Sequence, residues 1–106
     1  MILVDASVLA NAFTDDGPVG SRSREELGRD THWAAPEHLL VETFSAVRSR
    51  YLGHKISEAR AAAALDALRM AAIERVSTLP LLGRMEELRD SVNGHDAAYV
   101  AAAEIY

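Results

Sequence analysis

Short strand-forming segments alternate with longer helix-forming segments along this chain. The predicted strands are Met1–Val4, Thr31–Ala35 and, more weakly, Ile73–Ser77. The first of them is apolar throughout, which is typical of a strand that is buried on both faces of a parallel sheet. Alternating strands and helices predict an α/β fold, in which right-handed crossovers join parallel strands. Three strands are few for such a sheet.

Capping residues and turn residues place six helices between and after these strands. Ser7 and Ser57 are the predicted N-caps of two helices, and Gly53 and Asn93-Gly94 mark breaks. We expect Pro36 to stop the second strand and to stand in the first turn of the next helix. The predicted helices cover Val8–Phe13, Val19–Gly28, Glu37–Leu52, Ala59–Ala72, Leu82–Val92 and, from about His95, the segment to Ile105.

Two of these helices have an apolar face that we expect to be buried. On the Glu37–Leu52 helix, one stripe at 100° per residue carries Leu40, Phe44, Val47 and Tyr51. On the last helix, the side expected in the core carries Tyr99, Val100 and Ala103.

Length and composition exclude several classes of protein. The 106 residues suit one domain, and the absence of cysteine excludes disulfides, thiolate zinc sites and cysteine nucleophiles. The longest apolar runs, Met1–Val4 and Ala61–Leu65, are far shorter than the ~20 residues of a membrane helix. The N-terminus lacks the features of a signal peptide. We therefore expect a cytoplasmic protein that does not associate with membranes.

Acidic residues outnumber basic ones by 16 to 11, which gives a formal net charge of −5. This balance argues against a domain that holds nucleic acid through an overall basic surface. It does not exclude an enzyme whose carboxylates hold divalent cations, because a bound metal inverts the local potential. The positions of individual acids therefore matter more than their number.

Asp5 follows the first predicted strand directly. In open α/β sheets, ligands bind at the carboxyl ends of the strands. An ionised carboxylate is costly there unless it is paired or holds a metal. The alternative is that Asp5 caps the next helix beside Ser7.

Glu42 and Asp96 are the other two acids with an informative position. On the helical wheel, Glu42 lies opposite the predicted apolar stripe and among small residues, which leaves room for a metal or a substrate. An ordinary solvated glutamate is the alternative. Asp96 stands in the first turn of the last helix, where the helix dipole alone would favour a negative charge.

Three segments that contain these acids resemble the motifs of a PIN domain. Met1–Leu9 (MILVDASVL) resembles the start of such a domain, and Ala35–Glu42 (APEHLLVE) is similar to its second motif. Asp96–Glu104 (DAAYVAAAE) resembles the Asp-Ala-x-Tyr-Val-Ala segment of VapC-type toxins. The three segments follow one another in the family's order and span the whole chain.

The resemblance implies a three-layer α/β/α fold with a parallel sheet and a divalent-metal endoribonuclease. Such an enzyme is the toxin of a type II toxin–antitoxin system and hydrolyses RNA phosphodiester bonds with a metal-activated water. The resemblance assigns Asp5, Glu42 and Asp96 to catalysis and to the binding of Mg²⁺ or Mn²⁺. It also implies that Ser7 helps to hold a metal-bound water. Oxygen ligands and a metal-lowered water pKa suit this chemistry.

The resemblance also implies partners. They are an RNA substrate, a cognate antitoxin and a second copy of the chain, with Val8–Leu27 and Val47–Leu65 as expected contact surfaces. Arg48, Arg50 and Lys55 are expected to contact the RNA backbone. The alternative is that these cations only complement the carboxyl end of their helix.

One departure from the family concerns the C-terminus. PIN domains continue past the Asp96 helix into a further strand and a fourth acid, in a Thr-x-Asp segment, whereas this sequence ends at Tyr106. We therefore expect a C-terminally incomplete PIN-like domain in which Met1–Asp5 is an exposed edge strand. The alternative function is a catalytically impaired toxin that binds antitoxin or dimerises.

Trp33 and the four histidines carry no functional assignment. Trp33 is expected in the core or against a helix rather than as a base-stacking platform. The four histidines, His32, His38, His54 and His95, show no shared spacing that would predict a zinc site.

Overall fold

The computed structural model describes all residues, 1–106, and contains one parallel sheet of three strands. Strand β2 (Trp33–Pro36) lies between β1 (Ile2–Leu3) and β3 (Ile73–Val76), and all pairings are parallel. The predicted α/β class and parallel sheet are therefore confirmed. Strand β1 is an edge strand, as expected.

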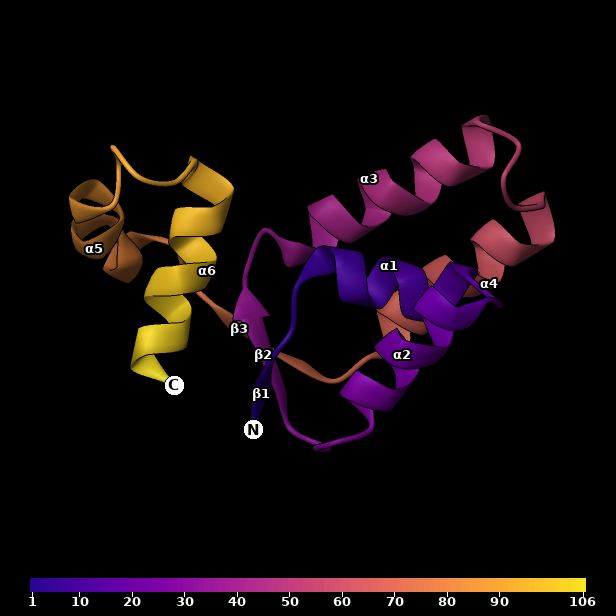
Figure 1. Cartoon of the computed structure of the whole chain (residues 1–106), viewed down its shortest axis with the longest axis horizontal. Helices are drawn as coiled ribbons and strands as arrows, with labels where there is room; N and C mark the ends of the chain where they lie inside the picture. The colour runs from indigo at the N-terminus through magenta and orange to yellow at the C-terminus, as the bar shows by residue number, and fades with distance from the viewer.

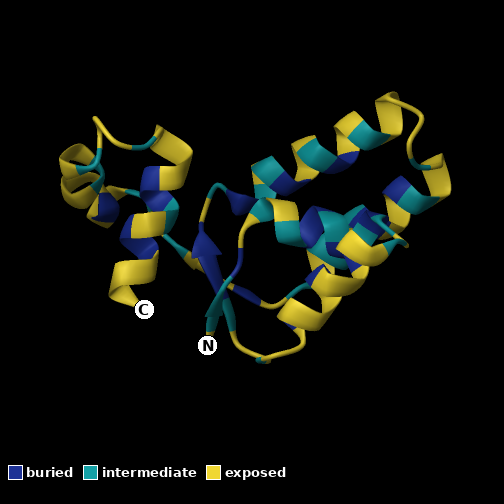
Figure 2. Ribbon diagram, viewed as in Figure 1, coloured by how far each residue is buried: buried dark blue, intermediate teal, exposed yellow.

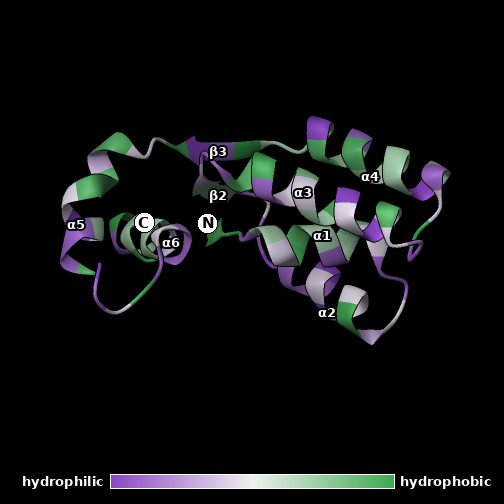
Figure 3. Ribbon diagram, turned by 90° about the horizontal axis from the view of Figure 1, so that it is seen from above, coloured by the Kyte–Doolittle hydropathy of each residue, from purple (hydrophilic) through white to green (hydrophobic).

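Helices cover both faces of this sheet (Figure 1, Figure 3). One side carries α1 (Ala6–Thr14), α2 (Pro18–Leu27), α3 (Leu39–Leu52) and α4 (Glu58–Met70). The other side carries a 3-10 turn η1 (Leu79–Leu81), α5 (Leu82–Glu87) and α6 (Gly94–Ile105). None of these helices combines the length and the hydropathy that a membrane-spanning segment needs.

Alternate residues of the first strand contribute to two separate cores. Ile2 and Val4 pack with the core beneath α1–α4, whereas Leu3 packs with the core beneath α6. This division follows from the side-chain alternation of a strand. In Figure 2 the buried residues accordingly lie along the sheet and on the helix faces turned toward it. The larger core is built around Leu9, Leu27, Leu39 and Ile73, and the smaller around Leu81, Ala98, Ala101 and Ala102.

The boundary between the second strand and the next helix differs from the prediction. The strand begins at Trp33 rather than Thr31 and includes Pro36, which pairs with Val76, and α3 begins only at Leu39. Pro36 is tolerated in the strand because its ring nitrogen faces the side of β1, which has already ended at Leu3. Pro36 is therefore not in the first turn of a helix.

Most other helix ends agree with the prediction. Gly53 follows the last residue of α3, and the Ser57 hydroxyl accepts a hydrogen bond from Arg60 N at the start of α4. The predicted Leu82–Val92 helix is shorter, because α5 ends at Glu87 and is followed by turns. The residues immediately after Leu88 are exposed, so no core contact extends this helix.

The predicted buried face of the third helix is wrong in part. The buried residues of α3 are Leu39, Thr43 and Val47, while Phe44 and Tyr51 are exposed. Helix α3 packs on α1 and α4 together, so neighbouring helices, and not the apolar stripe alone, select the inward face. The four predicted residues share only Val47 with the observed buried set.

The predicted core face of the last helix is wrong for two of its three residues, because only Tyr99 packs against a core. The buried residues of α6 are alanines, and Val100 and Ala103 are exposed. Small side chains allow α6 to lie close to η1 and to the sheet, and the larger side chains are turned away from that contact. The structure places Tyr99, Val100 and Ala103 along a cavity instead.

Candidate functional site

A cavity of about 560 Å³ lies where the end of β1 and the starts of α1, α3 and α6 come together. It is located at the carboxyl end of the first strand, where open α/β sheets bind ligands. Its walls contain all three acids singled out from the sequence. The lining residues are Leu3, Asp5, Ala6, Ser7, Glu42, Asp96, Tyr99, Val100 and Ala103.

Asp5 is both the residue after β1 and the N-cap of α1. Its Oδ1 accepts a hydrogen bond of 3.0 Å from the Val8 backbone N–H and one of 2.7 Å from the Ser7 hydroxyl. The predicted N-cap was Ser7, and that prediction is wrong. Asp5 is the better acceptor because it is an ionised carboxylate at the positive end of the helix. Ser7 instead orients the Asp5 carboxylate.

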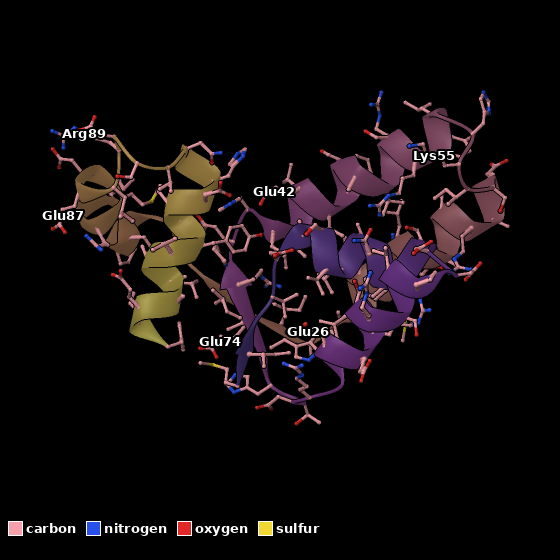
Figure 4. The ribbon with its side chains drawn as sticks, in the orientation of Figure 1. Glu26, Glu42, Lys55, Glu74, Glu87 and Arg89 are labelled. Carbon is pink, nitrogen blue, oxygen red and sulfur yellow. The ribbon has the colours of Figure 1, made fainter.

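Glu42 stands in the first turn of α3, at the end of the helix that faces α6 (Figure 4). Its side chain is 27 % exposed, and Oε1 accepts a hydrogen bond of 3.1 Å from the Tyr99 hydroxyl. Burial raises the pKa of Tyr99, and the negative charges of Glu42 and Asp5 raise it further. Tyr99 therefore remains a neutral donor that holds the Glu42 carboxylate.

Asp96 lies on the exposed surface of the first turn of α6 and is not its N-cap. That cap is Asn93, whose Oδ1 accepts a hydrogen bond of 2.9 Å from the Asp96 backbone N–H. The Asn93 amide in turn donates to Asp96 Oδ2 at 3.2 Å. These two hydrogen bonds fix the first turn of α6 and the orientation of the Asp96 side chain. The Asp96 carboxylate therefore lines the cavity from the α6 side.

The three carboxylates share the cavity without a lysine or arginine side chain beside them. No lysine or arginine forms an ion pair with Asp5, Glu42 or Asp96. Their oxygen donors suit a hard divalent cation that keeps several of its own waters. As they stand, however, no three acidic or histidine side chains are grouped closely enough to hold one metal ion directly.

Two histidines that carried no functional assignment from the sequence lie beside Glu42. His38 Nε2 is 3.2 Å from Glu42 Oε1, without hydrogen-bond geometry, and His95 Nδ1 is 3.8 Å from Glu42 Oε2. Two sequence signals were available. His38 is four residues before Glu42 on the same helix start, and His95 directly precedes Asp96.

The basic residues expected at the RNA lie away from this cavity. Figure 4 shows Glu42 and Lys55 toward opposite ends of the α3 segment. Arg50 donates to Asn11 Oδ1 at 2.8 Å and to Thr14 Oγ1 at 3.0 Å, which ties α3 to α1. Arg48 and Lys55 are exposed and form no ion pair. A structural role therefore accounts for Arg50.

Trp33 has the structural role that was expected. Its ring packs against the larger core, and its Nε1 donates to the backbone oxygens of Leu27 at 3.1 Å and Asp30 at 2.8 Å. These contacts join the start of β2 to the end of α2.

Neither a scan against protein-family models nor a search of curated proteins found a match to this sequence.

Proposed function

We propose that this protein is a PIN-like, divalent-metal-dependent endoribonuclease. The observation that carries the proposal is the cavity at the end of β1. There, Asp5, Glu42 and Asp96 come from three different helix starts without an ion pair to lysine or arginine, and two histidines lie beside Glu42. Carboxylates that face one cavity attract a divalent cation. The resemblance of the three segments to VapC-type motifs gives the reaction class.

In this proposal Asp5, Glu42 and Asp96 would hold Mg²⁺ or Mn²⁺. When bound, the metal would supply an activated water and offset charge on the phosphodiester. Ser7 keeps the Asp5 carboxylate in place through its 2.7 Å hydrogen bond, and Tyr99 does the same for Glu42. Arg48 and Lys55 would contact the RNA only at a distance from the acids.

The same resemblance supports the wider role. We propose a toxin that acts on cytoplasmic RNA, forms a homodimer and is neutralised by a cognate antitoxin. Val8–Leu27 and Val47–Leu65 are the proposed surfaces for these contacts, because the family uses its early helices in this way.

A second candidate is a module that binds antitoxin or dimerises without cleaving RNA. Two observations favour it. The acids are not grouped for direct chelation, and an apolar groove of about 390 Å³ lies between α3, α4 and β3. The groove is lined by Leu40, Phe44, Leu65, Leu68, Arg69, Ala71, Ile73 and Arg75.

RNA cleavage with and without Mg²⁺ or Mn²⁺ separates the two candidates. Asp5→Asn, Glu42→Gln and Asp96→Asn keep the size and most hydrogen bonds of each side chain. We expect each of them to lower the metal-dependent rate by at least about 100-fold. Asp90→Asn is the matched control, because Asp90 is exposed and its substitution removes the same charge away from the cavity. A wild-type protein that cleaves no faster than Asp5→Asn would support the binding module instead.

A further inference from the structure

The imidazole rings of His38 and His95 form a stack at the edge of the carboxylate cavity. Their centroids are 5.3 Å apart, and their planes differ by 23°. The Tyr99 ring meets His38 edge-on at 5.4 Å and 75°, so three aromatic rings follow one another from the cavity wall toward the surface. We call the rings of His38 and His95 the histidine stack. It joins the start of α3 to the start of α6.

The two rings of the histidine stack differ in exposure. The His38 side chain is 22 % exposed, whereas that of His95 is 73 % exposed. One face of the His95 ring is turned toward His38 and partly overlaps it. The exposed area therefore belongs mainly to the outer face and the edge of His95, which leaves a flat aromatic surface open next to Asp96.

The geometry of the histidine stack favours the stacking of a further flat ring on it over the binding of one metal ion by both imidazoles. Imidazole binds a metal through a lone pair that lies in the plane of the ring. In two stacked, nearly parallel rings these lone pairs do not converge on one point. The outer face of an exposed ring, in contrast, is the surface on which a nucleobase stacks.

We propose that the outer face of His95, supported from behind by His38, binds one unpaired nucleobase of an RNA strand. The proposal rests on the proposed ribonuclease function, and it adds a binding position for one base, which must be free to stack. A base inside a duplex has both faces covered and does not fit. Because His95 directly precedes Asp96, the bound base belongs to a nucleotide close to the phosphate at the carboxylates.

Binding of short single-stranded oligo-adenosine and oligo-uridine RNAs, in the presence of Ca²⁺ to neutralise the carboxylates, tests the proposal. We expect His95→Ala to raise Kd at least about fivefold, as loss of one stacked base predicts. His95→Phe retains a flat ring and should stay within about twofold of wild type. His32→Ala is the control, because it removes an imidazole at the opposite ends of the strands and should leave Kd unchanged.

Three results would overturn the proposal, and they differ in what they say about the nuclease. Equal binding by wild type and His95→Ala, with metal-dependent cleavage intact, overturns the stacking site alone. Equal weakening by His95→Ala and His95→Phe also overturns it, because charge or hydrogen bonding would then be the cause. A wild-type protein that binds no RNA overturns both proposals. If the Kd values follow the expected pattern but the wild-type protein does not cleave RNA, the nuclease proposal is contradicted and the stacking site is retained.

Discussion

The two helical layers cover the same sheet, but they are packed with different side chains. The layer of α1–α4 buries leucines and an isoleucine around Leu9, whereas α6 presents mainly alanines to Leu81. Alanines bring a helix close to its neighbours but remove little apolar surface from water. Most of the hydrophobic stabilisation therefore lies on the α1–α4 side of the sheet.

This difference matters for function because the candidate site belongs to both layers. Asp5, Glu42 and His38 come from the α1–α4 side, and His95 and Asp96 come from α6. Few polar contacts join the two sides near the cavity, and the Tyr99–Glu42 hydrogen bond is one of them. The site is therefore complete only while α6, which packs through alanines, stays docked on the sheet.

The largest effect is expected in the larger core. Leu9 is 0 % exposed, so Leu9→Ala should lower the free energy of unfolding by about 2–5 kcal/mol, because it removes apolar contacts and leaves a cavity. Urea denaturation measures the change. Leu52→Ala, at a residue that is 52 % exposed, is the control and should change stability by less than about 0.5 kcal/mol. Equal effects of the two substitutions would contradict the packing argument.

The second prediction concerns the smaller core. Leu81→Ala should lower the free energy of unfolding by about 2–3 kcal/mol, near the lower end for buried leucines. It should also let α6 unfold locally more often than the rest of the chain. Amide hydrogen exchange would then accelerate in Gly94–Ile105 while α1 stays protected. The neighbouring exposed Leu82→Ala serves as the control. Uniform acceleration in both layers would show that they unfold as one unit.

Two glycines offer a matched pair, one in each layer. A Cβ on Gly20 would lie 1.8 Å from the Asp15 backbone oxygen, so Gly20→Ala should cost about 1–3 kcal/mol by forcing α1 and α2 apart. A Cβ on Gly83 meets nothing within 4 Å, and Gly83→Ala in α5 should stabilise by about 0.5–1 kcal/mol. Thermal unfolding of both variants measures the contrast. Stability changes of the same sign in Gly20→Ala and Gly83→Ala would contradict this prediction.

The smallest effect is expected for the ion pair between α5 and α6. Arg84 contacts both Glu104 oxygens, at 2.8 and 3.0 Å, and its hydrogen bonds lower the pKa of Glu104. A lowered pKa stabilises the fold above the ordinary glutamate range, and this contribution is lost as the pH falls through that range.

Glu104→Gln tests this contribution. The variant should be slightly less stable than wild type at about pH 7, and the difference should shrink as the pH falls below the ordinary glutamate range to about pH 2. Urea midpoints at the two pH values check the prediction. A difference that is constant with pH would assign the effect to packing instead of charge.

Local signals in the sequence determined much of the fold and part of the site. Short strand-forming segments predicted three parallel strands, and Ser57 and Gly53 marked helix ends. Asp5 and Asp96 were singled out beside a strand end and a helix start, and Glu42 from its place on the helical wheel. Such signals act within a few residues, because capping and propensity are properties of a short stretch of backbone.

Only the tertiary structure decided which helix faces are buried and which distant side chains meet. Helix α3 buries Thr43 and exposes Phe44, and α6 packs through alanines, because each face depends on the neighbouring helices that contact it. The stack of His38 on His95 likewise joins residues from opposite layers, which no local spacing can place together. Local preference is a property of the backbone segment, whereas burial and long-range contact are properties of the packed whole.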